Sequence, residues 1–401
     1  MLRKDLLIDK TRTLLGEFLD PTLGQLDKPR RRFLRQTIRA ILFSGSLVVM
    51  ELCKWVRDKC SDPFYQDKRL LNNLVSPRAD LGMAVTAYRR SLNRYIQPQT
   101  PFAIDLTDLA KPRARKMKYL ALVRDGSEGN LVTGYWCIEV YAHLKGKRVL
   151  PLALDVYSID DPAVSSENMQ IERVVDAINT DLQGNGVWVA DRGFDRLELY
   201  EMWLSRNCHF VVRQRGGRAV ITHQDARVIL KDYVEMLAQH NARQGQCSNI
   251  VFARVHLPDY AKALYVVASW LPGHDEPFIL LTTLVVETLE QARNILRYYK
   301  KRWVCEEAGQ FLKSRVGLER FRVRRYVAIQ RLAILAMLAM GFLTWILLRS
   351  RDLTKRLFSL TSRFRKDVMF KYYRLLDGIQ QFVRLNPDEY IIPPPDIQKN
   401  G

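Results

Sequence analysis

The chain has 401 residues, of which 47% are hydrophobic and 26% are charged, so it can form two or three packed domains and is neither disordered nor fibrous. Its formal net charge of +20 favours a polyanionic partner, either nucleic acid or an anionic membrane surface. The six cysteines form no CxxC pair, the six histidines show no zinc-site spacing, and the charged N-terminus lacks the apolar run of a signal peptide. These features predict a reduced cytoplasmic, nucleoid-associated protein.

Residues 1–100 are predicted to be helical, because apolar residues recur at three- and four-residue spacing. Within them, residues 28–43 and 47–60 predict two helices joined by a tight turn at residues 44–46. A helix-turn-helix DNA reader and an ordinary helical hairpin fit this pair about equally, since no base-reading residues can be identified. Our interpretation of residues 1–100 is a helical DNA-binding domain.

The periodicity changes to short β-rich runs after residue 101, with Asp125-Gly126 and Lys145-Gly146 supplying turns between neighbours. The predicted strands are 102–106, 117–125, 133–144, 149–158, 187–190 and 209–215, with helices over 166–182 and 195–206. This order of elements is that of an RNase H-like mixed sheet, whose first part we assign to residues 101–215.

The remaining chain predicts three further regions. Residues 216–287 form a basic, turn-rich stretch and then three β runs, which indicates a β-rich insertion. A long helix is expected to begin near Thr288 and run past Lys313, completing the core over 288–320, and residues 321–401 are expected to be helical and basic. The predicted fold class is therefore α+β.

One segment of the last region, Leu332 to Leu348, is apolar enough to raise the question of a membrane span. It is only 17 residues long and Arg331 and Arg349 close it, which places it at the short limit for spanning a bilayer. A helix buried on most sides of a core has the same appearance. We favour the buried helix over a membrane protein.

Two aspartates follow predicted strands of the sheet. Asp105 ends the run FAIDL, and Asp191 follows the apolar run VWVA. Taken singly, each is more simply explained as a capping or turn residue.

A third acidic residue belongs to a regular pattern on the predicted long helix. The pattern consists of Tyr299, Arg302, Glu306 and Lys313. At about 100° per residue these side chains fall within roughly 60° of one another, whereas Glu307 lies on another side. A solvated face with an Arg302/Glu306 pair is the alternative, and it leaves Tyr299 and Lys313 unexplained.

These residues resemble the insertion-sequence transposases of the IS-four group in the DDE superfamily. The pattern around Glu306 matches the group's Y-x2-R-x3-E-x6-K signature, residues 105–107 resemble its D-x-T context, and residues 191–194 resemble its D-R-G-F context. The resemblance covers about residues 100–320, including a β insertion before the glutamate.

The resemblance implies a DNA transposase with Asp105, Asp191 and Glu306 as catalytic metal ligands. Such an enzyme binds the terminal inverted repeats of its element and performs phosphodiester hydrolysis and strand transfer by cut-and-paste, with or without a hairpin intermediate. Its partners would be double-stranded transposon-end and target DNA, bound by a homodimer in a synaptic complex inside a bacterial cell, with no membrane. In this group a tryptophan of the insertion stacks on a flipped base; Trp270 is the candidate here, although a core tryptophan is the simpler explanation.

The chemistry of phosphodiester cleavage suits three carboxylates. Two Mg²⁺ ions about 3.5 to 4 Å apart activate the nucleophile and stabilise the leaving oxygen, and Mg²⁺, or Mn²⁺ in its place, prefers oxygen ligands. Our hypothesis is that Asp105 bridges both ions while Asp191 and Glu306 each hold one. Arg302 and Lys313 would bind phosphates, and Tyr299 would position a phosphate oxygen or the backbone.

Four basic runs flank the proposed site and favour a DNA path. They are residues 28–32, 111–118, 297–302 and 320–325. Solvated charged faces are the usual alternative for each run taken singly. Two other functions stay open beside transposition: an RNase H-like nuclease that does not transpose, and a non-catalytic DNA-binding protein.

Overall fold

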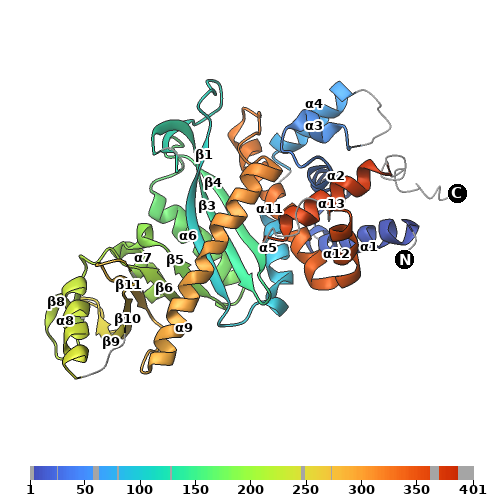
Figure 1. The fold of residues 1–401 in the computed structure, drawn as a ribbon. Helices are drawn as coiled ribbons and strands as arrows, with labels where there is room; N and C mark the ends of the chain where they lie inside the picture. The colour runs from blue at the N-terminus through green and yellow to red at the C-terminus, as the bar shows by residue number, and fades with distance from the viewer. Residues whose placement is uncertain are drawn as a thin grey trace.

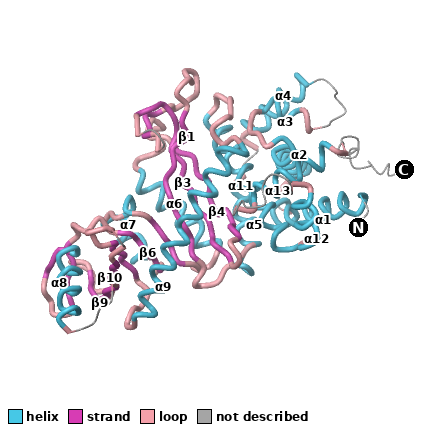
Figure 2. Tube along the Cα trace, in the orientation of Figure 1, coloured by secondary structure: helices cyan, strands magenta, loops and turns pink. Residues whose placement is uncertain are grey.

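One mixed sheet runs through the middle of the molecule, with a helical body at one end and a smaller β lobe at the other (Figure 1). The computed structural model describes residues 4–24, 26–56, 63–78, 81–126, 129–244, 249–271, 273–361 and 370–386. Figure 2 shows how the helices gather at the end where both termini lie, while the strands occupy the centre and the opposite lobe.

The central sheet has the RNase H-like arrangement that the sequence predicts. Its strands are β1 (Pro101–Ala110), β2 (Ala121–Arg124), β3 (Leu131–Leu144), β4 (Arg148–Tyr157), β5 (Val187–Ala190) and β6 (His209–Arg213). β3 pairs antiparallel with β1, β2 and β4, whereas β1, β5 and β6 run parallel. Helices α6 (Glu167–Asp181) and α7 (Leu197–Ser205) connect the parallel strands, as expected of crossovers.

The close approach of β1 and β3 depends on a glycine. Gly134 in β3 faces Leu109 of β1, and a Cβ atom added to Gly134 would lie 2.5 Å from the Leu109 carbonyl oxygen. A larger residue would push the two strands apart. The sequence pattern suggested that the first strand ends at residue 106. In the structure β1 stays paired with β3 as far as Ala110.

The insertion continues the same sheet. It contains β7 (Ala219–Thr222), β8 (Arg227–Ile229), α8 (Leu230–Arg243), β9 (Ile250–His256), β10 (Leu264–Ser269) and β11 (Phe278–Thr282). β11 pairs antiparallel with β6, so the lobe is joined to the core by backbone hydrogen bonds. The three predicted β runs are present, but α8 replaces part of the expected turn-rich stretch because Leu230, Tyr233 and Val234 bury one helical face.

The first and last parts of the chain form one helical body. Its helices are α1 (Lys4–Leu23), α2 (Lys28–Ser44), α3 (Val49–Cys53), α4 (Pro63–Val75), α5 (Gly82–Ser91), α11 (Tyr326–Arg349), α12 (Arg351–Ser359) and α13 (Tyr372–Arg384), with a 3-10 turn η1 (Asn93–Tyr95). α2 packs on α11 and α13, and α1 packs on α5 and α11. The division of the chain into five regions stays a prediction, although the two terminal regions share a hydrophobic core.

Helix α11 lies at the centre of this body and against β4. It is long and apolar enough to cross a membrane, yet 78% of its most apolar window is buried inside the protein. The preference for a buried core helix over a span is therefore confirmed.

The predicted helical pair over residues 28–60 is only partly present. α2 ends at Ser44, where Gly45 adopts φ 65° as the left-handed cap. The second helix, α3, has five residues, and residues 57–60 lie outside the described part of the chain. An expected helix over residues 47–60 is thus wrong for its described portion, and so short an α3 favours an ordinary helical turn over a base-reading helix.

The expected long helix near Thr288 consists of several helical pieces. Thr288 and Gln291 form a capping box that starts α9 (Leu289–Lys300). A 3-10 turn, η3 (Lys301–Trp303), then leads into α10 (Val304–Phe311), and a π turn, η4 (Leu312–Val316), ends at Gly317 with φ 78°. The helical run therefore begins after Thr288 and passes Lys313 as expected, but its 3-10 and π turns advance by other angles per residue than a regular α-helix.

Candidate active site

Asp105 and Asp191 lie beside each other on neighbouring parallel strands. β1 and β5 pair from Pro101 opposite Val187 to Ala103 opposite Val189. Asp105 lies two residues further along β1, and Asp191 directly follows the last residue of β5. The two residues, 86 positions apart in sequence, are close enough for the charge of Asp191 to act on the Asp105 carboxylate.

Asp191 also caps the turn that follows its strand. Its Oδ1 atom accepts a 2.7 Å hydrogen bond from the backbone N–H of Gly193, at the start of the 3-10 turn η2 (Arg192–Phe194). Asp191 is therefore a capping residue through its Oδ1 atom, as the simpler explanation from the sequence predicted. The cap fixes the carboxylate at the carboxyl end of β5, which is where a site residue of a parallel sheet belongs.

Glu306 reaches the aspartates through a shared arginine. The Arg302 guanidinium donates from Nη1 to Asp105 Oδ2 at 3.3 Å and from Nη2 to Glu306 Oε1 at 2.7 Å. Its side chain is only 11% exposed, whereas that of Glu306 is 43% exposed. The carboxylates of β1 and α10 thus converge on one positive charge at a partly open surface.

The electrostatics of Asp105 show that the three acids interact. Burial is the main cause that raises the pKa of Asp105 to about 6; Arg302 lowers this pKa, and the negative charges of Asp191 and Glu306 raise it further. An acid whose ionised form is disfavoured by two neighbouring carboxylates gains from an added cation. Glu307, by contrast, is half-buried; burial raises its pKa, and the charge of Lys147 lowers it.

Tyr299 and Lys313 precede and follow the Arg302–Glu306 pair along the helical run. The Tyr299 ring packs edge-on against Phe278 of β11, with ring centroids 5.0 Å apart, and the Arg302 guanidinium lies 5.6 Å from its centroid. Tyr299 therefore forms a wall of the site towards the insertion.

Lys313 lies directly after α10, in the π turn η4. Its Nζ atom lies 3.5 Å from Asp108 Oδ1 and 3.0 Å from Glu319 Oε1. The single stripe of four side chains stays a prediction; the run has a 3-10 turn at Arg302 and a π turn at Lys313, and Arg302 contacts both Glu306 and the Tyr299 ring. Trp270, the other candidate, is half-buried and packs against the core.

Sequence reasoning missed Glu139, a fourth acid behind the site. It lies opposite Asp105 in the β1–β3 register and is 2% exposed. Burial, and then the charge of Asp105, raise its pKa to about 8, while Lys313 lowers it. The available signal was an acidic residue within a strand whose neighbours on both faces are apolar.

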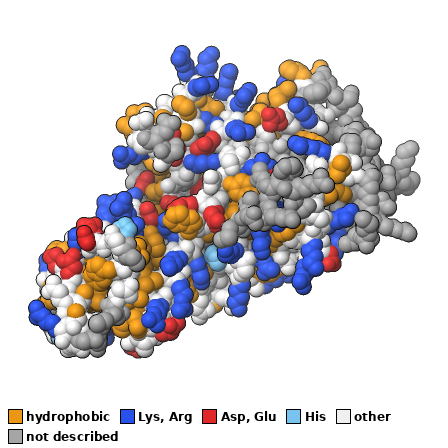
Figure 3. Space-filling model, viewed as in Figure 1, with side chains coloured by type: hydrophobic (Ala, Val, Ile, Leu, Met, Phe, Trp, Pro, Cys, Tyr) orange, Lys and Arg blue, Asp and Glu red, His pale blue; other side chains and the backbone are white. Residues whose placement is uncertain are grey.

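A basic surface adjoins the acids at the end of the molecule where β1 turns towards β2. The backbone N–H of Lys118 donates to the Arg324 carbonyl at 3.0 Å, which brings two basic runs together. Their exposed cations are Arg113, Arg115, Lys116, Lys118, Arg320, Arg322, Arg324 and Arg325. Figure 3 shows Lys and Arg side chains gathered at this upper end.

Other cations of the basic runs serve the fold. Arg30 forms an ion pair with the capping Asp27, and Arg31 donates to the Leu26 carbonyl. Lys111 is buried and donates to the carbonyls of Glu319 and Phe321. Only part of the basic sequence is therefore free to meet a polyanion.

Within the described residues, no three His, Cys, Asp or Glu side chains are already grouped as a metal cage. Asp105, Asp191 and Glu306 come from β1, the residue after β5, and α10. Arg302 occupies the space between two of them.

Comparison with known proteins assigns the family. Residues 96–342, more than half of the chain, match the family described as "Transposase DDE domain". The chain belongs to this family: it is a DDE transposase, an enzyme of DNA transposition and recombination that cleaves and joins DNA, and divalent metal ions are the general cofactor of such enzymes.

Among solved structures, the chain is similar to a piggyBac transposase synaptic complex with hairpin DNA, at 11% identity and a TM-score of 0.47, over 99% of this chain and 87% of that one. No curated protein sequence matches the chain.

Proposed function

We propose that the chain is the transposase of an insertion sequence of the IS-four group, which binds the element's terminal inverted repeats and catalyses hydrolysis and strand transfer at its ends. What supports this proposal is that Arg302 pairs with both Asp105 and Glu306, and that the charges of Asp191 and Glu306 act on the Asp105 carboxylate. Excision by cut-and-paste, with or without a hairpin intermediate, is the reaction that the resemblance implies.

The donor set fits two Mg²⁺ ions, with Mn²⁺ as a substitute. Asp105 and Glu306 already share one cation, the Arg302 guanidinium, and Asp191 raises the pKa of Asp105. Carboxylate oxygens are the ligands that Mg²⁺ prefers. Asp105 would bridge both ions, while Asp191 and Glu306 would each hold one; bound ions supply a stronger nucleophile and a stabilised leaving oxygen.

The neighbouring side chains would bind the DNA strand. The Arg302 guanidinium lies between two of the acids, so it would bind a phosphate after exchanging its contacts with Asp105 or Glu306. Tyr299, on the insertion side, would position a phosphate oxygen or the backbone. Lys313 would act on a phosphate only after exchanging its contacts with Asp108 and Glu319.

Substitution of each acid tests the proposed mechanism. Asp105→Ala, Asp191→Ala and Glu306→Ala should each abolish nicking and strand transfer on a labelled element end with Mg²⁺, because each removes a metal ligand, while binding of the end persists in a gel-shift assay. Glu307→Ala is the matched control on α10 and should retain cleavage. Cleavage that survives loss of any of the three acids would reject the assignment.

A plasmid carrying the element's terminal repeats separates the competing functions. A transposase cuts at the repeat ends and joins them to target, a nuclease degrades the DNA without joining, and a non-catalytic binder does neither. We propose a homodimer that synapses two ends in the bacterial cytoplasm at the nucleoid, with the exposed cations of residues 113–118 and 320–325 on the DNA path.

A further inference from the structure

Glu139 lies directly behind the proposed metal-binding acids, on the strand next to Asp105. It projects from β3 towards α10, the helix that carries Glu306. The hydroxyl of Tyr141 donates to Glu139 Oε2 at 3.2 Å, and Oε1 accepts no hydrogen bond from the described residues. A buried carboxyl group with a hydrogen bond to only one of its oxygens lowers the stability of the fold, so its presence here calls for a specific explanation.

Gly309 of α10 provides the other half of this contact. A Cβ atom added to Gly309 would lie 2.9 Å from Glu139 Oε2 and 3.6 Å from its Cδ, closer than a carbon atom can rest on an oxygen. Alanine favours a helix more than glycine does, so the helix itself gives no reason for glycine at this position. The missing side chain is what allows α10 to rest on the carboxyl.

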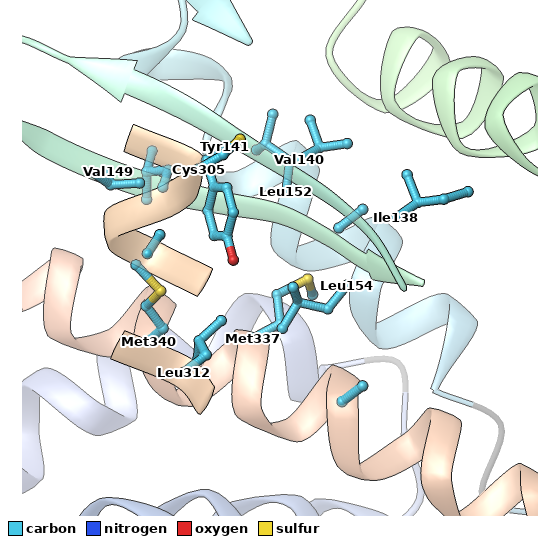
Figure 4. Packing of buried hydrophobic residues seen from close by; sticks show 14 of the residues in the cluster. Ile138, Val140, Tyr141, Val149, Leu152, Leu154, Cys305, Leu312, Met337 and Met340 are labelled. Carbon is cyan, nitrogen blue, oxygen red and sulfur yellow. The ribbon is translucent and has the colours of Figure 1, made fainter. Parts of the chain in front are cut away.

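The Glu139 carboxyl has little room to move aside. Tyr141 and Cys305 are fully or nearly fully buried around it, and Ala308 and Leu312 of the same helical run are completely buried. Figure 4 shows the Tyr141 ring projecting from the strands beside Cys305, with Leu312 below. A bulkier residue at position 309 would therefore either push the Glu139 carboxyl against these packed neighbours or move α10 away from β3.

The position of α10 is also the position of Glu306. Gly309 follows Glu306 by three residues, so the two lie on adjoining sides of the same helix, about 60° apart. A shift of α10 at Gly309 would move the Glu306 carboxylate relative to Asp105. A displacement of about 1 Å is enough to spoil a catalytic geometry.

We infer that Glu139 is a positioning residue, which together with Gly309 fixes the distance of α10 from β3 and thereby holds Glu306 at metal-binding distance from Asp105. The inference rests on the proposed metal-dependent function. It concerns the contact between Glu139 and Gly309, neither of which binds DNA or metal itself. It requires only a carboxyl-shaped side chain at position 139, so an amide of the same shape should suffice.

Mn²⁺ binding to the full chain, measured by calorimetry in the absence of DNA, tests the inference. Gly309→Ala should weaken Mn²⁺ binding by about tenfold or more, the range seen when groups supporting metal ligands are lost. Glu139→Gln should bind like wild type. The double variant Glu139→Ala/Gly309→Ala should recover most of the affinity lost in Gly309→Ala, because the methyl group then occupies the space of the carboxyl.

Gly16→Ala in α1 is the matched control, since a Cβ added there has nothing within 4 Å, and it should leave Mn²⁺ affinity unchanged. Wild-type affinity in Gly309→Ala, or no recovery in the double variant, would overturn the inference. Urea unfolding of the same four variants shows whether each folds, and adding the single variant Glu139→Ala completes the cycle that measures the coupling of positions 139 and 309. A wild-type protein that binds no Mn²⁺ would reject the proposed function itself, and this inference with it.

Discussion

The acids of the site differ in the charge state that their surroundings favour. Asp105 has a pKa of about 6 beside Arg302, whereas Glu139, one strand away and fully buried, has a pKa of about 8. Glu139 is therefore neutral over most of the acidic and neutral range. The two carboxyl groups face each other across the β1–β3 pair, and a full negative charge on both would be unfavourable.

The raised pKa of Glu139 predicts how stability changes with pH. The folded protein holds this proton more tightly than the unfolded chain, whose glutamate has the ordinary value of 4.5. The stabilisation is complete below the unfolded pKa, and it is lost as the pH rises towards about 8. Wild type should lose unfolding free energy relative to Glu139→Gln across this range, by at most about 1.4 kcal/mol per pH unit.

Urea denaturation of both proteins at several pH values measures this difference. Titrating groups that do not interact with Glu139 are common to the two proteins, so their effects cancel in the comparison, whereas that of Asp105 is part of the difference because its charge acts on Glu139. Parallel stability curves would mean that Glu139 is ionised in the folded protein at neutral pH, contrary to the expectation.

At the scale of elements, a buried ion pair joins the helical body to the catalytic sheet. Asp181 is the last residue of α6, where its negative charge interacts unfavourably with the negative end of the helix dipole. Its side chain is 4% exposed. Arg89 of α5 donates to Asp181 Oδ2 at 2.8 Å, and Arg90 donates to Oδ1 at 3.3 Å. Arg89 is itself buried, whereas the Arg90 side chain is 60% exposed.

Removing the shared aspartate should destabilise the protein strongly. Asp181→Ala leaves the buried Arg89 without its carboxylate, which costs about 3–5 kcal/mol of unfolding free energy. Arg90→Ala is the comparison, because an exposed partner contributes less than about 1 kcal/mol. Denaturant titration of both variants checks the difference, and equal losses would show that burial of this pair does not matter.

At the scale of the whole molecule, the positively charged residues have two roles: some stabilise the fold and others are exposed. Some cations are engaged in caps and turns, such as Arg31 and Lys111. Others, in residues 113–118 and 320–325, are exposed side by side near the acids. The β lobe at the opposite end has exposed cations too, including Arg227 and Arg243.

The salt dependence of DNA binding should distinguish these two surfaces. Arg113→Ala/Arg115→Ala should weaken binding of an element end and reduce the slope of log K against log salt by up to about 1.8, because two phosphate contacts are lost. Arg227→Ala/Arg243→Ala changes the net charge equally and should have a smaller effect on the slope. Equal effects in fluorescence anisotropy would show that total charge, and not this surface, governs binding.

The sequence determined the kinds of element and the chemical residues. Apolar periodicity identified the strands of the central sheet, the apolar core helix α11 and the helical termini, because this pattern is a local property of neighbouring residues. Asp105, Asp191 and Glu306 were predicted as the catalytic acids from their places after strands and within a spaced motif, and this assignment stays a prediction. Of the two neighbouring glutamates, Glu306 pairs with Arg302.

Only the tertiary structure decided which partner each side chain has. Arg302 lies between two acids, Lys313 is held by Asp108 and Glu319, and Glu139 meets Gly309. The insertion joins the sheet through β11, and irregular turns break the helix that carries Glu306. Strand register, burial and helix irregularity arise from contacts between segments far apart in the chain, which a pattern of adjacent residues does not contain.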